Sequence, residues 1–186
     1  MRKYFGCLFP VFISAFFCFA QDKKQSAHPS FGILGGVTRS TIGGDNDSYS
    51  KWLIGWQAGA LMFLDFGSPS HFVFGAEANV SSEGWKQEPP AGWSMKATLI
   101  YLNVPLVAQL RDPLGFYAEA GVQPGFLLSA KDKSNGVSQD IKDDLNSIDF
   151  GIPVGIGYIH KTKIGINVRY IFGVANINKA DNVEDH

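Results

Sequence analysis

The feature that most constrains this chain is a two-residue alternation of apolar with small or polar residues, which begins after residue 30 and recurs along most of the sequence. A β-strand points successive side chains to opposite faces, so this alternation predicts strands with one apolar and one polar face. Seven such segments follow one another, at 31–39, 52–65, 71–81, 95–110, 116–130, 148–159 and 164–177. Because no useful length of helical periodicity interrupts them, the sequence predicts an all-β fold.

Strands of this kind can build either a transmembrane β-barrel or a soluble β-sandwich, and the composition of the less apolar face distinguishes the two. In the segment 164–177, Ile166 and Val168 lie on the apolar face. The opposite face holds Asn167 and Arg169 between glycines, and most other segments show a similar excess of glycine with single polar residues. The segment 52–65 obeys this rule less well, because Leu61 and Phe63 lie opposite its other apolar residues. Small residues suit the tight interior of a narrow barrel, whereas a solvated sheet face usually bears long polar side chains. The pattern favours an antiparallel up-and-down transmembrane β-barrel over a soluble β-sandwich, which would also alternate.

The connections between the segments alternate in length. Long polar connections are expected at 40–51, 82–94 and 131–147, and tight turns at 66–70, 111–115 and 160–163. Long loops at one end and short turns at the other are typical of an outer-membrane barrel. Aromatic residues near the expected strand ends, including Trp52 and Tyr101, are candidates for interfacial girdles, with ordinary packing as the alternative.

The N-terminal region has the composition of a secretory signal peptide. Arg2 and Lys3 precede an apolar run, and Ala20 provides the small residue at which cleavage is expected. We therefore divide the chain into a signal peptide at 1–20, a linker at 21–30 and a barrel domain at 31–186. A retained anchor is the alternative, although the apolar run is short for a membrane-spanning helix, which needs about 20 residues.

Removal of this signal would change the chemistry available to the mature chain. Both cysteines, Cys7 and Cys18, lie within it, so a cleaved chain can form neither a disulfide nor a thiolate metal site. Without Arg2 and Lys3, fourteen basic residues remain against seventeen acidic ones. This slightly acidic balance, without a block of like charge, argues against a nucleic-acid partner.

Four charged residues fall on the face expected to point into the barrel, namely Glu77, Glu119, Asp149 and Arg169. Isolated charges in a medium of low dielectric constant cost several kcal/mol, so charges in a narrow barrel must pair or be hydrated. We therefore expect Arg169 to contact at least one of the three carboxylates and to form a structural polar network. About eight strands leave an interior just wide enough for side chains, which favours a static plug over a gated polar path.

Histidines and acidic loop residues are the candidates for catalysis or metal binding in this sequence. The histidines His28, His71, His160 and His186 lie off the expected interior face and lack metal-ligand spacing. The acidic loop residues Asp45, Asp47, Asp140, Asp143 and Asp144 could hold calcium, but the first pair lacks the closing glutamate of an EF-hand. We expect no catalytic residues, no cofactor and no metal, and hence no enzyme.

The sequence resembles the PorT-like outer-membrane β-barrel proteins of Gram-negative bacteria. The similarity rests on an ordered set of short motifs: FGILGG at 31–36, GWQAG at 55–59, YLNVPL at 101–106, FYAEAG at 116–121, DFG at 149–151, GIGY at 155–158 and VRY at 168–170 with Gly173 and the pair at 176–177. The resemblance implies an eight-stranded barrel in the cell outer membrane, and links some members to protein secretion machinery. Asn103 stands where the family pattern leads us to expect an acidic residue.

Seven strands are visible where eight are expected. Bacterial single-chain barrels have an even strand number, and residues 178–186 are polar and loop-like. We therefore expect the closing strand to be missing and the sequence to be a fragment. The alternative, an extra strand from the linker 21–30, is opposed by Lys23, Lys24 and Pro29.

These observations predict a non-enzymatic, plugged outer-membrane barrel with a structural or binding role in the envelope. Its expected partners are outer-membrane lipid and envelope proteins that contact the external loops. The alternatives are a porin-like pore for small solutes or ions, an accessory component of a protein secretion system, and a lipid-modifying enzyme.

Overall fold

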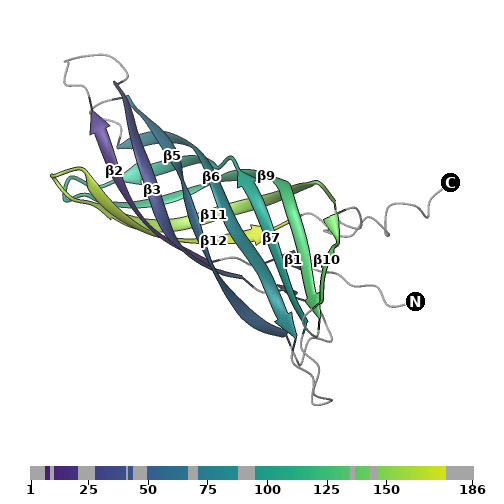
Figure 1. Ribbon diagram of the computed structural model, residues 1–186. Helices are drawn as coiled ribbons and strands as arrows, with labels where there is room; N and C mark the ends of the chain where they lie inside the picture. Colours follow the sequence, from purple (N-terminus) through teal and green to yellow (C-terminus); the bar gives the residue numbers. More distant parts are fainter. Residues whose placement is uncertain are drawn as a thin grey trace.

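The fold is a closed antiparallel barrel with eight strand positions in its wall (Figure 1). We call each position a stave, because one of them is filled by two consecutive strands. The computed structural model describes residues 7–8, 11–20, 28–40, 42–43, 50–66, 71–87, 95–134, 137–142 and 146–174. The predicted all-β antiparallel barrel is confirmed, and each strand pairs with neighbours that run in the opposite direction. In the described part of the chain, no helix is long and apolar enough to cross a membrane.

The staves follow one another around the ring mostly in sequence order. They are β2 (Val11–Ala20), β3 (His28–Ser40), β5 (Ser50–Asp65), β6 (Phe72–Gln87), β7 (Met95–Asn103) with β8 (Leu106–Arg111), β9 (Phe116–Ser134), β11 (Ile148–Ile159) and β12 (Ile164–Gly173). The ring closes because β12 pairs with β2. Three short strands lie outside the ring: β1 (Cys7–Leu8) pairs with β4 (Ile42–Gly43), and β10 (Val137–Asp140) pairs with β9.

The eighth stave, β2, comes from the segment that the sequence analysis assigned to the signal peptide. Ala15 lies opposite Ile166 of β12 on one side and opposite Gly35 of β3 on the other. The count of seven visible strands was therefore one short, because Val11–Ala20 also alternates, with Phe16 buried and Phe17 exposed. A short apolar run is compatible both with a signal peptide and with a buried β-strand. Cleavage after Ala20 stays a prediction.

The end of the predicted linker and several predicted strand ends also differ in the structure. Residues 28–30 of the linker belong to β3, while 21–27 lie outside the described residues. The sixteen-residue strand β6 continues through Gln87, into the region expected to be a loop. Residues 175–186, which include the end of the last predicted strand, also lie outside the described residues.

One predicted strand, 95–110, is divided into β7 and β8 around Pro105. Proline has no backbone N–H and cannot complete a ladder, so it favours an interruption at this point. The carbonyl of Pro105 still accepts from the N–H of Glu77 at 2.9 Å. The barrel wall thus remains hydrogen-bonded across the break, and Glu77 is held where its strand meets β8.

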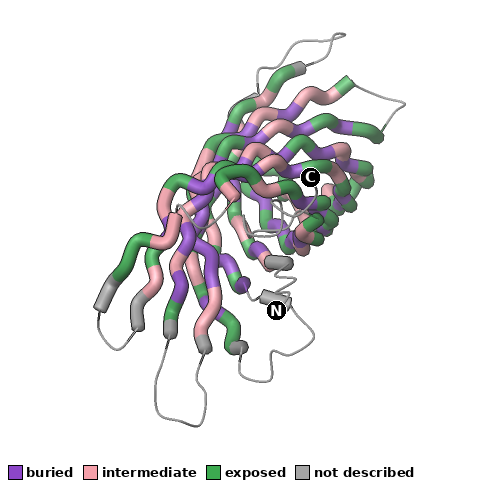
Figure 2. The backbone as a smooth tube through the Cα atoms, turned by 90° about the vertical axis from the view of Figure 1, so that its right-hand side faces the viewer, coloured by how far each residue is buried: buried purple, intermediate pink, exposed green. Residues whose placement is uncertain are grey.

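Apolar side chains cover the outside of the barrel. Alternate residues along the staves are exposed (Figure 2). They include Ile13, Phe17, Phe31, Ile33, Ile54, Trp56, Phe72, Phe74, Phe126, Leu128, Ile152, Val154, Ile156, Ile164, Ile166 and Val168. Monomeric soluble proteins rarely expose a continuous apolar surface of this kind, whereas it suits the hydrocarbon region of a membrane.

The barrel interior is filled by apolar side chains near both ends. At the end with the short turns, a cluster joins Phe16, Leu34, Leu61, Phe63, Val73 and Tyr117, and we call it the turn-end cluster. Towards the long loops, Leu99, Tyr101, Leu127 and Ala130 form the loop-end cluster. Leu61 and Phe63, which break the polar pattern expected for the inner face of β5, are buried in the turn-end cluster. Polar residues lie between the two clusters.

Candidate functional site

The centre of the interior is an ion-pair network around Arg169 of β12. Its Nη1 and Nη2 atoms donate to the two carboxylate oxygens of Glu77 at 2.8 and 2.7 Å. Its Nε atom donates to Oε1 of Glu119 at 2.7 Å. All three residues are buried, with exposed fractions of 8% for Arg169, 6% for Glu77 and 3% for Glu119. Bidentate contacts of this kind are short and directional, so the network ties β12 to both β6 and β9.

Glu119 extends this network towards the turn end. Its Oε2 atom accepts from Gln109 at 2.9 Å, and its Oε1 atom accepts from Asn167 at 3.0 Å. Gln109 accepts in turn from Nε and Nη2 of Arg111, at 3.0 and 2.7 Å. The Arg111 guanidinium lies over the ring of Phe63, 4.7 Å from its centroid. A continuous set of polar contacts therefore joins the ion pairs to the turn-end cluster.

Glycines on β11 leave the space that this network occupies. A Cβ atom at position 155 would lie 2.8 Å from Oε1 of Glu119. A Cβ atom at position 157 would meet the ring of Tyr117, whose hydroxyl accepts from Asn167 at 3.0 Å. Gly155 and Gly157 are thus explained by close approach to large side chains on β9.

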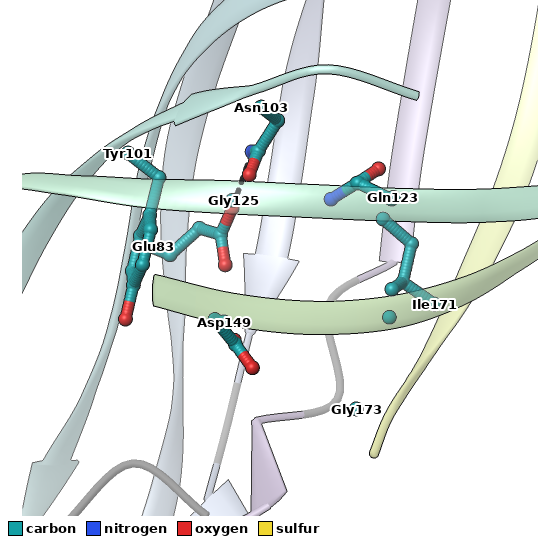
Figure 3. A pocket seen from close by; sticks show the side chains of 9 residues that line it. Glu83, Tyr101, Asn103, Gln123, Gly125, Asp149, Ile171 and Gly173 are labelled. Carbon is teal, nitrogen blue, oxygen red and sulfur yellow. Dashed lines mark hydrogen bonds between the residues drawn. The ribbon is translucent and has the colours of Figure 1, made fainter. Parts of the chain in front are cut away.

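Three of the four charged residues predicted for the interior meet, and the fourth does not. Arg169 contacts Glu77 and Glu119. Asp149, at the start of β11, lies instead in a separate group towards the long loops (Figure 3). Its Oδ1 atom accepts from the backbone N–H of Phe150 at 2.7 Å, and its side chain is half-buried.

The second polar group is built around Glu83 of β6. Ser81 and Asn103 donate to Oε1 of Glu83 at 2.6 and 3.3 Å, and Asn103 also donates to Ser81 at 2.9 Å. The acidic residue that the family pattern leads us to expect at position 103 is absent, but Glu83 supplies a carboxylate beside it. Figure 3 shows this contact from Asn103 as a dashed line.

Sequence reasoning missed Glu83 because it assigned 82–94 to a loop. The signal that could have found it is the continued alternation through Ser81, Glu83 and Trp85, which belong to one long strand. Tyr101, expected in an outer girdle, is instead 2% exposed and packs in the loop-end cluster. Trp52 and Trp56 do face outwards.

No catalytic arrangement emerges from the described residues. His71 and His160 are exposed at the short turns, and Nδ1 of His160 is 2.9 Å from the hydroxyl of Thr162. Within the same ranges, no group of three or more His, Cys, Asp or Glu side chains gathers as metal ligands would. The side chain of His28, all of His186, and the acidic loop residues Asp45, Asp47, Asp143 and Asp144 lie outside the described residues, whereas Asp140 is exposed.

Comparison with known proteins gives one match. Residues 19–179 match the family model described as the outer membrane protein beta-barrel domain. No curated protein and no solved structure matches the chain. The matched region begins near the end of β2 and includes the six other unbroken staves and the divided one.

Proposed function

Because this chain belongs to the family of the outer membrane protein beta-barrel domain, we propose that it is a plugged, non-enzymatic barrel of the outer membrane with a structural or binding role. The observation that carries the proposal is the bidentate contact of Arg169 with Glu77, together with its contact with Glu119, in the middle of the barrel. Breaking a buried ion pair by removing one partner costs about 3–5 kcal/mol, so the contacts favour a permanently filled interior over a gate that opens readily.

The apolar clusters support the same proposal. The turn-end cluster brings Phe16, Phe63 and Tyr117 into the narrow interior, and the loop-end cluster brings Leu99 and Tyr101. A hydrated path for ions or small polar solutes would need polar walls along its whole length. Two apolar layers above and below the ion pairs oppose continuous hydration and favour a plug.

The partners follow from this arrangement. The exposed apolar belt, with residues such as Ile156 at 67% exposure, is suited to outer-membrane lipid. With the interior filled, recognition of envelope proteins would fall to the long connections between strands. The absence of a basic block in the sequence argues against nucleic acid. The ordered motifs similar to PorT-like proteins support a role beside a secretion system as the narrower form of the proposal.

Planar-bilayer recording tests the plug directly. Purified protein should give no discrete conductance steps, because the interior is filled. A double variant, Glu77→Ser with Arg169→Ser, removes both long side chains but leaves the two apolar clusters in place, so it should also give no steps. Lys161→Met, at an exposed turn, is the control and should behave as the wild type. Reproducible steps from the wild-type protein would establish a pore and reject the plug.

Neighbouring genes and lipid turnover distinguish the remaining classes. Secretion components encoded beside this gene would support the secretion role. Hydrolysis of phospholipid that is lost in a His71→Ala or His160→Ala variant would show that the protein is an enzyme. We expect no such hydrolysis, because both histidines are exposed at the short turns, and the hydroxyl beside His160, that of Thr162, is exposed there too.

A further inference from the structure

A small cavity lies between the central ion pairs and the loop-end cluster. Its walls include Glu83, Tyr101, Asn103, Gln123 and Asp149 (Figure 3). The cavity measures about 20 Å³, which is enough room for about one water molecule. With Ile171 and Gly173, which also line it, the cavity is bordered by five strands, namely β6, β7, β9, β11 and β12.

Two carboxylates face this cavity without a basic partner. Arg169 is engaged by Glu77 and Glu119, and no basic side chain of the described residues forms an ion pair with Glu83 or Asp149. Glu83 is 5% exposed, and its contacts from Ser81 and Asn103 are hydrogen bonds from neutral groups. A buried and a half-buried acidic group that share a cavity favour either a bound cation or a shared loss of charge.

A third group indicates that an occupant belongs there. The hydroxyl of Tyr101 is buried and has no hydrogen-bond partner, although its residue lines the same cavity and is only 2% exposed. An unpaired buried hydroxyl costs about 1–3 kcal/mol. An occupant that accepts the oxygen lone pair, or hydrates it, would remove that cost.

We propose that this cavity binds one hard divalent cation of the Ca²⁺ type, held by the carboxylates of Glu83 and Asp149 and by the Tyr101 hydroxyl. The side-chain donors that line the cavity are oxygens and amides, without His or Cys, and oxygen ligands select hard cations over zinc or copper. Two carboxylates balance a double positive charge. Gln123 and Asn103 offer further amide oxygens, and the cation would fill the space of about one water molecule.

The site should be of low affinity. Calcium affinity depends on the number of charged ligands and on the rigidity of the site, and two carboxylates place the expected dissociation constant at about 10⁻⁴–10⁻³ M, the range of extracellular modules. Asp149 is only half-buried, so its side chain is partly accessible to solvent. The cation would link β6 to β11 and stabilise the loop end of the barrel. This inference does not depend on whether solutes cross the barrel.

Calcium and terbium titrations of the full chain, folded in detergent and freed of metal with EDTA, test the proposal. Tb³⁺ luminescence excited through the aromatic rings should appear on binding and be displaced by Ca²⁺. Glu83→Gln and Asp149→Asn should each weaken binding by roughly tenfold or more, because each removes a charged ligand but keeps the shape. Tyr101→Phe should weaken it less.

Asp112→Asn is the matched control, since Asp112 is an exposed acid at a turn on the opposite end of the barrel. It should bind as the wild type does. Retained heat-modifiable mobility on gels would show that each variant is folded. The proposal is overturned if the folded wild type binds no Ca²⁺ at about 10 mM, well above the expected range. It is also overturned if the Glu83 and Asp149 variants bind as tightly as the control, or if the wild type is stabilised by low pH but not by Ca²⁺.

Discussion

Arg169 donates hydrogen bonds of 2.7 and 2.8 Å to the two carboxylate oxygens of Glu77, a residue 92 positions earlier in the chain. The two residues lie on strands that are not neighbours in the ring, because β12 pairs with β11 and β2 while β6 pairs with β5, β7 and β8. The contact therefore crosses the interior. It braces the barrel from within, in addition to the hydrogen bonds around its wall.

Replacing Arg169 with Met should lower the free energy of unfolding by about 3–5 kcal/mol, because two buried carboxylates lose their counter-charge. Lys161→Met, at an exposed turn, should change it very little. Urea unfolding of the two variants in the same detergent measures the difference. Equal midpoints for both variants would mean that the ion pairs do not brace the barrel.

Replacing Gly157 with Ala should destabilise the barrel by about 1–3 kcal/mol through overpacking. The added methyl group would meet the ring of Tyr117 and would lie 2.6 Å from the carbonyl oxygen of Ile166. Gly35→Ala is the control, since its Cβ would have no heavy atom nearer than 3.9 Å. Thermal unfolding of both variants, followed by circular dichroism, should lower the midpoint for Gly157→Ala only. A comparable loss in both would point to a general need for glycine in these strands.

A charge placed on the outer belt should distinguish a membrane barrel from a soluble one. Ile156 in β11 and Leu114 in a turn are both strongly exposed, at 67% and 73%. Ile156→Arg should cost up to about 2–4 kcal/mol if this position lies near the bilayer midplane, and Leu114→Arg far less because turns lie near the interface. The folded fraction in lipid vesicles, read from unboiled and boiled gel samples, gives the comparison. Equal folding of the two variants would argue that residue 156 does not face lipid.

Cysteine cross-linking should locate β2 in the folded full chain. With Cys7 and Cys18 changed to Ser, the pair Ala15→Cys and Ile166→Cys should form a disulfide, because directly opposed residues of antiparallel strands lie about 4.5–5.5 Å apart. The pair Ile13→Cys and Ile166→Cys is out of register by two residues and should cross-link poorly. A trypsin digest under non-reducing conditions, followed by mass spectrometry, detects the bridge. Equal yields from the two pairs would place β2 in a different register or outside the ring.

The sequence pattern predicted which residues face inwards far better than it predicted which of them meet. Alternation places Glu77, Glu119, Asp149 and Arg169 on the inner face, and strand periodicity is sufficient for that inference. Whether two inward residues touch depends on the tilt and stagger of the staves, which no single strand encodes. Asp149 therefore lies apart from the other three, although it shares their face.

The same limit explains the residues that were missed. Glu83 was assigned to a loop because serines and a glycine surround it after the apolar part of β6. In the structure, pairing with β7 keeps this polar segment extended as part of the same strand. Gln109 and Arg111 lie at the end of β8 beside a turn, and only the approach of Glu119 across the ladder brings them into the network. Contacts between strands decide these positions, whereas local propensity does not.

The placement of β2 means that export processing and barrel closure act on the same ten residues. If a signal peptidase cuts after Ala20, as the composition predicts, it removes the strand β2 from the barrel wall. The facing edges of β12 and β3 are then left with unpaired backbone groups. Each unsatisfied N–H or C=O costs several kcal/mol in hydrocarbon, so a cut chain would need a replacement strand at that gap before it could sit stably in a bilayer. Proteolysis would then decide how the barrel assembles. A chain that keeps these residues can close its barrel alone, whereas a chain that loses them can insert only together with a replacement strand.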